Sequence, residues 1–366
     1  MAAKTMKPRS ERWVGLLGDD PRSWLLASEE PAARFVVMTE LLDSPADDPE
    51  VESARAAVLA DQGTKDLIGR LPDWDAGVPF SGHQSPGFAP NILQLLADMG
   101  VRGDDDLHVE RLLDQMLDHQ EPNGRFASFG TSPVVKKPAW GSVLCDTHAI
   151  TEVLVRYGRA EDPRTVAALQ RMTADLAETT QGRAWPCVPS SVGNWRGPGR
   201  KADFCPQVTL EALRTFARLP AARRPPGLID VARVSLRAWR VRHEEKPYMF
   251  GHGRRFATAK WPQFWYDANW VLDTLGRYPA LWRGAKARPE DRAALAEIAA
   301  SLIAANFGPD GRVTPRSCYK GFEAFSFGQK KRPSPFATAR LCTVLRRVDD
   351  LAPDIAAADV NQPPKL

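Results

Sequence analysis

Three cysteines in the middle of the chain are candidates to share a metal ion. Cys145 is followed by His148, and residues three apart on a helix project from nearly the same face. Cys187 lies in a segment with Pro and Trp, and Cys205 directly precedes a second apolar helical pattern. Thiolates and an imidazole suit zinc. The sequence therefore predicts a zinc site formed by Cys145, His148, Cys187 and Cys205.

The same cysteines also have a simpler interpretation. Cysteine is among the most buried residue types, and Cys318 and Cys342 are expected to be apolar core residues. The long gaps between the three predicted ligands match no compact zinc motif. If zinc is bound, three thiolates with His148 would form a closed structural site. A catalytic site would instead keep a water or a substrate thiol in that place.

A second segment that could take part in chemistry spans residues 248–279. His252, between two glycines, is a candidate general acid or base, an alternative fourth zinc ligand, or part of a turn. Arg254 and Arg255 could hold an anionic group or form a solvated surface pair. Aromatic faces bind apolar and cationic ligands. They are concentrated at Trp261, Phe264, Trp265, Tyr266 and Trp270.

Two acidic residues at expected helix starts are candidates for proton transfer. Asp146 lies beside Cys145, and we expect it to handle protons together with His252. Asp267 follows the aromatic segment, where an N-terminal cap is its expected role and a catalytic acid the alternative. A third charged feature, Lys330 to Arg332, is expected to be a charged loop, with phosphate binding as the alternative.

The composition is that of a globular protein. The chain has 366 residues, of which 43% are hydrophobic and 26% charged, and its formal net charge is only +4. Basic residues are spread along the chain, which argues against nucleic acid as a partner. The N-terminus lacks the apolar run of a signal peptide, and no segment is long and apolar enough to span a membrane. We therefore expect a cytoplasmic protein.

Helical periodicity dominates, and one unit returns along the chain. Each copy has an apolar helix, a short turn, a more amphipathic helix and a loop rich in Gly, Pro and aromatic residues. Asp48 and Asp162, each followed by proline, predict N-caps at two of the turns. Such hairpins must stack on one another to bury their apolar faces. Five to six copies are expected, starting at Pro31, Pro90, Cys145, Cys205, Tyr266 and, as a half-unit, Ser334.

The hairpin endings "HQEPNGRF", "TTQGRAW" and "NFGPDGRV" resemble the Gln, Gly and aromatic repeats of the squalene cyclase and protein prenyltransferase superfamily. The resemblance covers roughly residues 20–348. It implies an all-α fold, an α/α toroid with inner and outer helices around a central cavity. We expect an N-terminal extension over 1–20, one toroid domain over 21–348 and a tail over 349–366.

The resemblance also implies where the candidate residues lie. In such a toroid, Cys145 and Cys205 would begin inner helices, and the three cysteines would meet at one rim. The prenyltransferases hold zinc there with Asp, Cys and His, and lanthipeptide cyclases with two Cys and a His; this chain matches neither pattern. It also lacks the DxDD acid motif. The segment that comes nearest to it, "RGDDDLHVE", lies in a turn between helices. This argues against terpene cyclisation started by that motif.

Two functional hypotheses follow. The first is a zinc-dependent enzyme that acts on a mainly hydrophobic small molecule in the cavity, by cyclisation, lyase chemistry or group transfer. The second is a non-catalytic toroid that binds or scaffolds a lipid-like ligand or a peptide, with structural cysteines.

Overall fold

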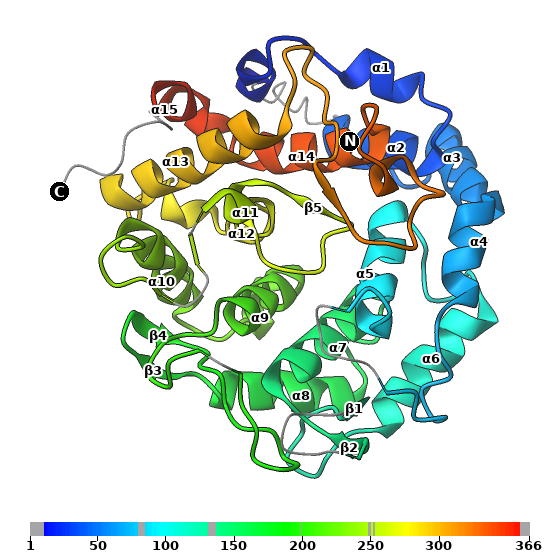
Figure 1. The fold of residues 1–366 in the computed structure, drawn as a ribbon, viewed down its shortest axis with the longest axis vertical. Helices are drawn as coiled ribbons and strands as arrows, with labels where there is room; N and C mark the ends of the chain where they lie inside the picture. The colour runs from blue at the N-terminus through cyan, green and yellow to red at the C-terminus, as the bar shows by residue number, and fades with distance from the viewer. Residues whose placement is uncertain are drawn as a thin grey trace, which may run out of the picture.

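The computed structural model describes residues 11–79, 85–130, 137–197, 199–247, 250–251 and 253–358. Within these residues, helices pair into a closed ring (Figure 1). Each inner helix packs on the next, and the last packs on the first. In ring order they are α2 (Pro31–Val36, continued by the π-helical turn η2, Val37–Leu41), α5 (Ala89–Met99), α7 (Leu144–Arg156), α9 (Pro206–Arg218), α12 (Ala268–Leu275) and α14 (Pro335–Arg347).

An outer layer of helices covers this inner ring (Figure 1). The all-α toroid expected from the sequence is confirmed by this arrangement. The larger outer helices are α3 (Pro49–Ala60), α4 (Gln62–Gly69), α6 (Leu107–Asp118), α8 (Pro163–Ala174), α10 (Leu228–Arg240) and α13 (Pro289–Asn306). Shorter helices lie in the connections and near the chain ends: η1 (Arg12–Leu16), α1 (Arg22–Leu26), η3 (Ala221–Arg223), α11 (Gly253–Ala257), η4 (Pro279–Leu281), η5 (Ser326–Gly328), η6 (Asp349–Leu351) and α15 (Ala352–Ala357).

The helix starts follow the capping signals in the sequence. Asp48 and Asp162 each accept a hydrogen bond from the backbone N–H two residues on, and a proline occupies the first turn of α3 and α8. Ser334 caps α14 in the same manner, through the N–H of Ala337. These caps satisfy backbone donors that have no partner within a helix. The hairpin boundaries at Asp48 and Asp162 are thus confirmed.

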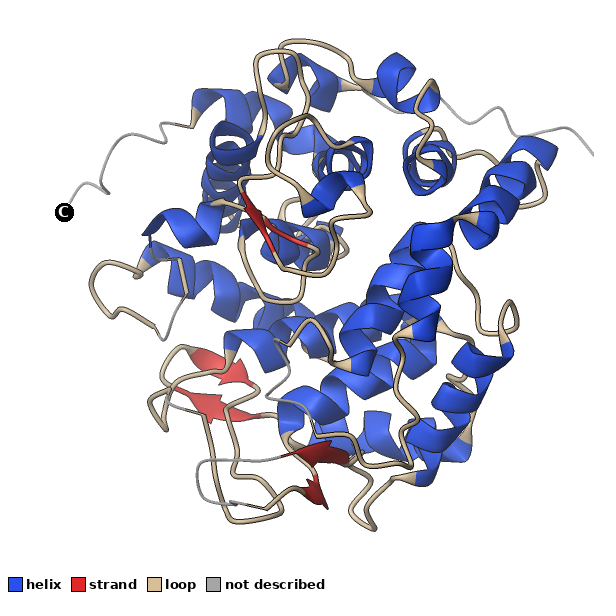
Figure 2. Ribbon diagram, turned by 45° about the vertical axis from the view of Figure 1, so that its right-hand side comes forward, coloured by secondary structure: helices blue, strands red, loops and turns tan. Residues whose placement is uncertain are grey.

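Long connections join each outer helix to the next inner helix, and they carry the few short strands (Figure 2). These connections precede the N-terminal ends of the inner helices, so the loops lie on one rim of the ring, called here the loop rim. Two pairs are antiparallel hairpins, β1 (Ser128–Gly130) with β2 (Ala139–Gly141) and β3 (Ala177–Thr179) with β4 (Gly182–Ala184). β5 (Lys260–Trp261) pairs in parallel with β6 (Ser317–Cys318).

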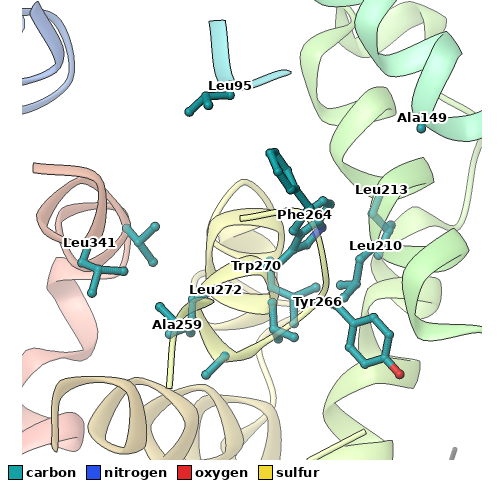
Figure 3. Packing of buried hydrophobic residues seen from close by; sticks show 14 of the residues in the cluster. Leu95, Ala149, Leu210, Leu213, Ala259, Phe264, Tyr266, Trp270, Leu272 and Leu341 are labelled. Carbon is teal, nitrogen blue, oxygen red and sulfur yellow. The ribbon is translucent and has the colours of Figure 1, made fainter. Parts of the chain in front are cut away.

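The hydrophobic core runs around the whole ring, between the two helix layers. Figure 3 shows one part of it, with buried side chains from α5, α7, α9, α12 and α14. The chain ends join this core, since Trp13 is buried and its backbone N–H donates to Asp349 at 2.7 Å. Residues outside the expected boundaries at 20 and 349 therefore pack together on the ring. No described helix is both long and apolar enough to cross a membrane.

Candidate functional site

One stripe of polar residues on α9 faces the interior of the ring. Gln207, Glu211, Arg214 and Arg218 recur at helical spacing along one face. Arg214 hydrogen bonds to Gln94 of α5, although α7 separates α5 from α9 in the ring. A bond between these two helices has to cross the interior, so the whole stripe borders it.

Glu211 is the most unusual member of this stripe. Only 2% of the residue is exposed, and burial raises the pKa of its carboxyl well above the ordinary value, with Glu152 and Asp146 adding to the effect. Oε1 accepts a hydrogen bond from Gln207 at 2.5 Å. Oε2 has no partner among the described residues. The surroundings of Glu211 therefore favour a neutral carboxylic acid, and one of its oxygens is left without a partner in the described chain.

Asp146, on the neighbouring helix α7, is a second buried carboxyl. It accepts hydrogen bonds from the Ser128 hydroxyl at 2.5 Å and from the Cys145 thiol at 3.7 Å. Burial raises its pKa to about 6, against these hydrogen bonds, which lower it. The pKa of Asp146 leaves it mostly ionised at neutral pH, whereas the surroundings of Glu211 favour its protonated form. Two interacting carboxyls with separated pKa values are the usual arrangement for an acid and a base in one site.

The predicted aromatic segment stands next to this pair. Gln207, which donates to Glu211, accepts the backbone N–H of Tyr266 at 3.3 Å, which fixes the orientation of its amide. The Trp270 ring lies 4.1 Å from the Arg214 guanidinium carbon. Figure 3 shows Phe264 and Trp270 on the side of α12 that faces α5 and α9. Trp270 thus lies against Arg214, three residues from Glu211 on α9, while Phe264 packs on Tyr319 and Phe322.

The other predicted ligand-binding residues pack on other aromatic rings, are exposed, or lie outside the described residues. Trp261 is buried in β5, where it packs on Phe327. The Trp265 ring packs on Tyr266 with centroids 4.6 Å apart. Arg255 is exposed. His252 and the side chain of Arg254 lie outside the described residues, so their predicted roles stay predictions.

Asp267 has the capping role that the sequence favoured. Its Oδ1 accepts the backbone N–H of Trp270 at 2.9 Å, and the side-chain amide of Gln263 lies within 3.4 Å of both carboxyl oxygens. Burial nevertheless raises its pKa to about 7. Because Asp267 can exchange a proton near neutral pH, its alternative role as a catalytic acid stays a prediction.

The three cysteines do come together at the loop rim. Cys145 is in the first turn of α7, Cys205 is the N-cap of α9, and Cys187 lies in the connection between α8 and α9. Burial raises the pKa of Cys145 well above its usual value and that of Cys205 to about 12, and each feels the charge of neighbouring thiols. The Cys187 sulfur accepts the N–H of Gly197 at 3.3 Å. The predicted proximity of the thiols is thus present.

His148 does not join them, which corrects the predicted ligand set. Its Nδ1 lies 3.0 Å from the Val208 carbonyl oxygen, and its ring meets Trp185 edge to face. Burial lowers its pKa to about 4, and the charges that act on it are Asp175, at the end of α8, and Arg125, in the connection after α6. Within the described chain, no three His, Cys, Asp or Glu side chains are grouped to hold a metal ion. Cys145, His148, Cys187 and Cys205 therefore do not fit zinc as arranged.

An ion-pair network fills the opposite end of the ring interior, at the C-terminal ends of the inner helices. Glu152 of α7 binds Arg214, with Arg218 at 3.6 Å. Asp98 of α5 binds Arg156 of α7 at 2.7 Å and Arg340 of α14 at 3.2 Å. On the α12 side the same network joins Asp273, Arg277, Arg347 and Glu40. These contacts tie all the inner helices together below the two carboxyls.

Comparisons with known proteins give a distant structural likeness. No family model and no curated protein matches the chain. Similar solved structures are those of type II terpene cyclase MstE from Scytonema. The apo structure has a TM-score of 0.42 and 16% identity, and the match covers 93% of this chain and 97% of that one. A variant bound to the substrate geranylgeranyl dihydroxybenzoate has a TM-score of 0.41 and 16% identity, over 89% and 88%.

At this similarity the comparison establishes neither a shared fold nor a shared activity. The ring of helices is established by the helix contacts of the chain itself.

Sequence reasoning missed Glu211 and Glu152. Each sits in a helix whose pattern is amphipathic, where a glutamate is normally a surface residue. The available signal was in α9, where Gln207, Glu211, Arg214 and Arg218 recur at helical spacing on a helix that also begins at a candidate ligand, Cys205. A polar stripe on an inner helix faces the ring interior rather than solvent.

Proposed function

We propose that the chain is an enzyme that cyclises a hydrophobic, alkene-containing small molecule by protonating it inside the ring. The observation that carries the proposal is Glu211, a buried carboxyl whose surroundings raise its pKa and whose Oε2 has no partner within the described residues. A carboxylic acid kept neutral by its surroundings can give its proton to a weak base such as an alkene.

The reaction balances without a co-reactant. The O–H bond at Oε2 of Glu211 breaks, and a C–H bond forms at one alkene carbon, which leaves a carbocation. The π electrons of a second alkene then form a C–C bond. Loss of a proton from the final cation to the ionised Asp146 leaves a new C=C bond, and transfer of that proton back to Glu211 restores the site.

Neighbouring side chains support this assignment. Aromatic faces such as those of Phe264 and Trp270 stabilise positive charge without acting as nucleophiles. Gln207 holds the carboxyl of Glu211 in place, since its own amide is fixed by Tyr266. The chain lacks a contiguous DxDD motif, but the fold supplies two carboxyls from adjacent helices instead. No step of this reaction involves a metal.

The test is to incubate the protein in D₂O with linear polyprenyl compounds, including geranylgeranyl dihydroxybenzoate, and to analyse products by mass spectrometry. A cyclic isomer that carries one deuterium at the initiating carbon is expected, because the carboxyl proton exchanges with solvent. Glu211→Gln keeps the acceptor for Gln207 but has no acidic proton, so turnover should fall by about 10²–10⁴-fold.

Glu178→Gln is the matched control, because Glu178 is an exposed carboxyl on β3. It should leave turnover unchanged. Undiminished cyclisation by Glu211→Gln, or a product without deuterium, would refute the proposal. Tight binding of these compounds, seen by tryptophan fluorescence and without any conversion, would favour the non-catalytic binding protein instead.

A further inference from the structure

A basic pocket lies on the rim opposite the loop rim, outside the ring interior. It has a volume of about 810 Å³ and is formed by the α9–α10 connection, the start of α10, and the segment from the end of α12 to the start of α13. This volume is within the usual range for small-molecule sites. Its walls carry five cations and one acid: Arg224, Arg233, Arg277, Lys286, Arg288 and Asp230.

The carboxylates of the described chain do not balance these cations. Arg233 is neutralised, since it pairs with Asp230 at 2.7 Å and with Asp291 at 2.8 Å. Among the described residues Arg277 forms an ion pair with Asp273, at 3.4 Å, which also binds Arg347, and it feels the charge of Glu40. Burial and the nearby Arg347 and Arg214 lower the pKa of Arg277. Its positive charge is therefore under-compensated on the wall of the pocket.

The remaining three cations have no carboxylate partner in the part of the chain described. Arg224 is held in place by the backbone carbonyls of Leu219 and Ala217, at 2.8 and 2.9 Å, which position a guanidinium without cancelling its charge. Lys286 and Arg288 are exposed and form no ion pair with the described residues. Mutual repulsion among these groups would be relieved by a bound anion.

Two helix N-termini add to the positive potential of the pocket. Gly227 is the N-cap residue of α10 and Arg288 that of α13, and at neither position do the described residues supply a side-chain cap. Residues from both starts line the pocket. The first backbone N–H groups of a helix and its dipole favour negative charge. Both helices are long enough for this effect, with 13 and 18 residues.

We propose that this pocket binds a phosphorylated small molecule that carries at least two negative charges. Guanidinium groups match phosphate oxygens in charge and in hydrogen-bond geometry, and several separate cations suit a diphosphate or two phosphates better than a single carboxylate. The site is separate from the carboxyls of the ring interior, so it does not depend on the proposed cyclisation. Arg277 connects the two regions, because it belongs to both the pocket and the ion-pair network.

The test is calorimetric titration of the full chain with inorganic diphosphate at low ionic strength. Lys286→Gln/Arg288→Gln removes two exposed cations with no structural partner, and it should weaken binding by at least about tenfold. Arg316→Gln/Lys320→Gln is the matched control. It removes the same charge from an exposed loop that precedes α14, on the loop rim, and should change the affinity less than about threefold.

A second arm separates a soluble phosphate from a lipid headgroup. Flotation with phosphatidylcholine vesicles, with and without phosphatidic acid, asks whether a membrane phosphate is bound through the same two residues. Binding in either arm that depends on Lys286 and Arg288 supports the site and identifies its source. Absence of binding in both arms, or equal weakening by both double variants, would overturn it.

Discussion

Arg214 of α9 donates a hydrogen bond from Nη2 to Oε2 of Glu152 on α7, at 2.7 Å, inside the ring. Both side chains are buried, with 9% and 0% of their surface exposed. The same guanidinium reaches Gln94 of α5 and lies over the Trp270 ring of α12. One arginine therefore contacts three other inner helices. The carboxylate of Glu152 offsets the cost of burying its charge in the interior.

Removal of this carboxylate should destabilise the protein strongly. Glu152→Gln leaves Arg214 and Arg218 buried without their acid, and we expect a loss of about 3–5 kcal/mol in the free energy of unfolding. Asp350→Asn removes the partner of Arg283 in an exposed pair, with exposures of 42% and 50%. It should cost less than about 1 kcal/mol. Urea denaturation of both variants measures the difference.

A double-mutant cycle shows whether the cost comes from the unpaired charge. Arg214→Met in the Glu152→Gln background removes one of the stranded cations, so the double variant should lose less stability than the sum of the two single variants. Strict additivity would contradict the coupling that the geometry implies.

The hairpin architecture could be predicted because its signals are local. Asp followed by Pro at positions 48 and 162 caps the next helix whatever surrounds it. The proximity of Cys145, Cys187 and Cys205 also followed, since it depends only on which helix ends share a rim.

The direction in which each side chain projects from its helix could not be predicted from the spacing of residues in the sequence. Three residues along a helix leave an offset of about 60°, and an inner helix is covered on both sides. That offset places Cys145 near the other thiols. It places His148 against Trp185 and within reach of the charges of Asp175 and Arg125. Glu211 was missed for a related reason, because only closure of the ring turns its stripe from a solvent face into an interior face.

The buried carboxyl of Asp146 should make stability depend on pH. Its pKa in the folded protein is raised from 3.8 to about 6, so the folded state favours the protonated form. That contribution is fully present below about pH 4 and is lost as the pH rises through about 6. Asp146→Asn cannot ionise and keeps an acceptor for Ser128. It should therefore be more stable relative to the wild type at pH 8 than at pH 4, by about 1–3 kcal/mol.

Thermal unfolding at the two pH values checks this. Glu178→Gln, at an exposed carboxyl, is expected to show no comparable pH-dependent gain. An Asp146→Asn variant that gains stability at pH 4 rather than at pH 8 would show that this carboxyl is held in its ionised form.

The thiols give a direct test of the predicted zinc site. Cys145, Cys205 and Cys342 have pKa values raised by burial, so their reaction with Ellman's reagent should be slow in the native protein and fast in denaturant. Because His148 is turned away and the thiols form no ligand group with it, EDTA should leave these rates unchanged. Faster reaction after chelation, together with release of stoichiometric zinc, would show that the cysteines do bind the metal.

Closure of the ring between α2 and α5 depends on a glycine. Gly100 ends α5 with φ of 105°, and a Cβ there would lie 2.6 Å from the Phe35 ring of α2. Gly158, just after α7, has φ of 80° and open space around it. Gly158→Ala should lower the free energy of unfolding by about 1 kcal/mol, because alanine disfavours the left-handed backbone conformation. Gly100→Ala should lower it by at least about 1 kcal/mol more. Chemical denaturation compares them.

In a Phe35→Ala background the clash is gone, so Gly100→Ala should then cost about as much as Gly158→Ala. If the excess cost persisted there, contact between α2 and α5 would not be its source.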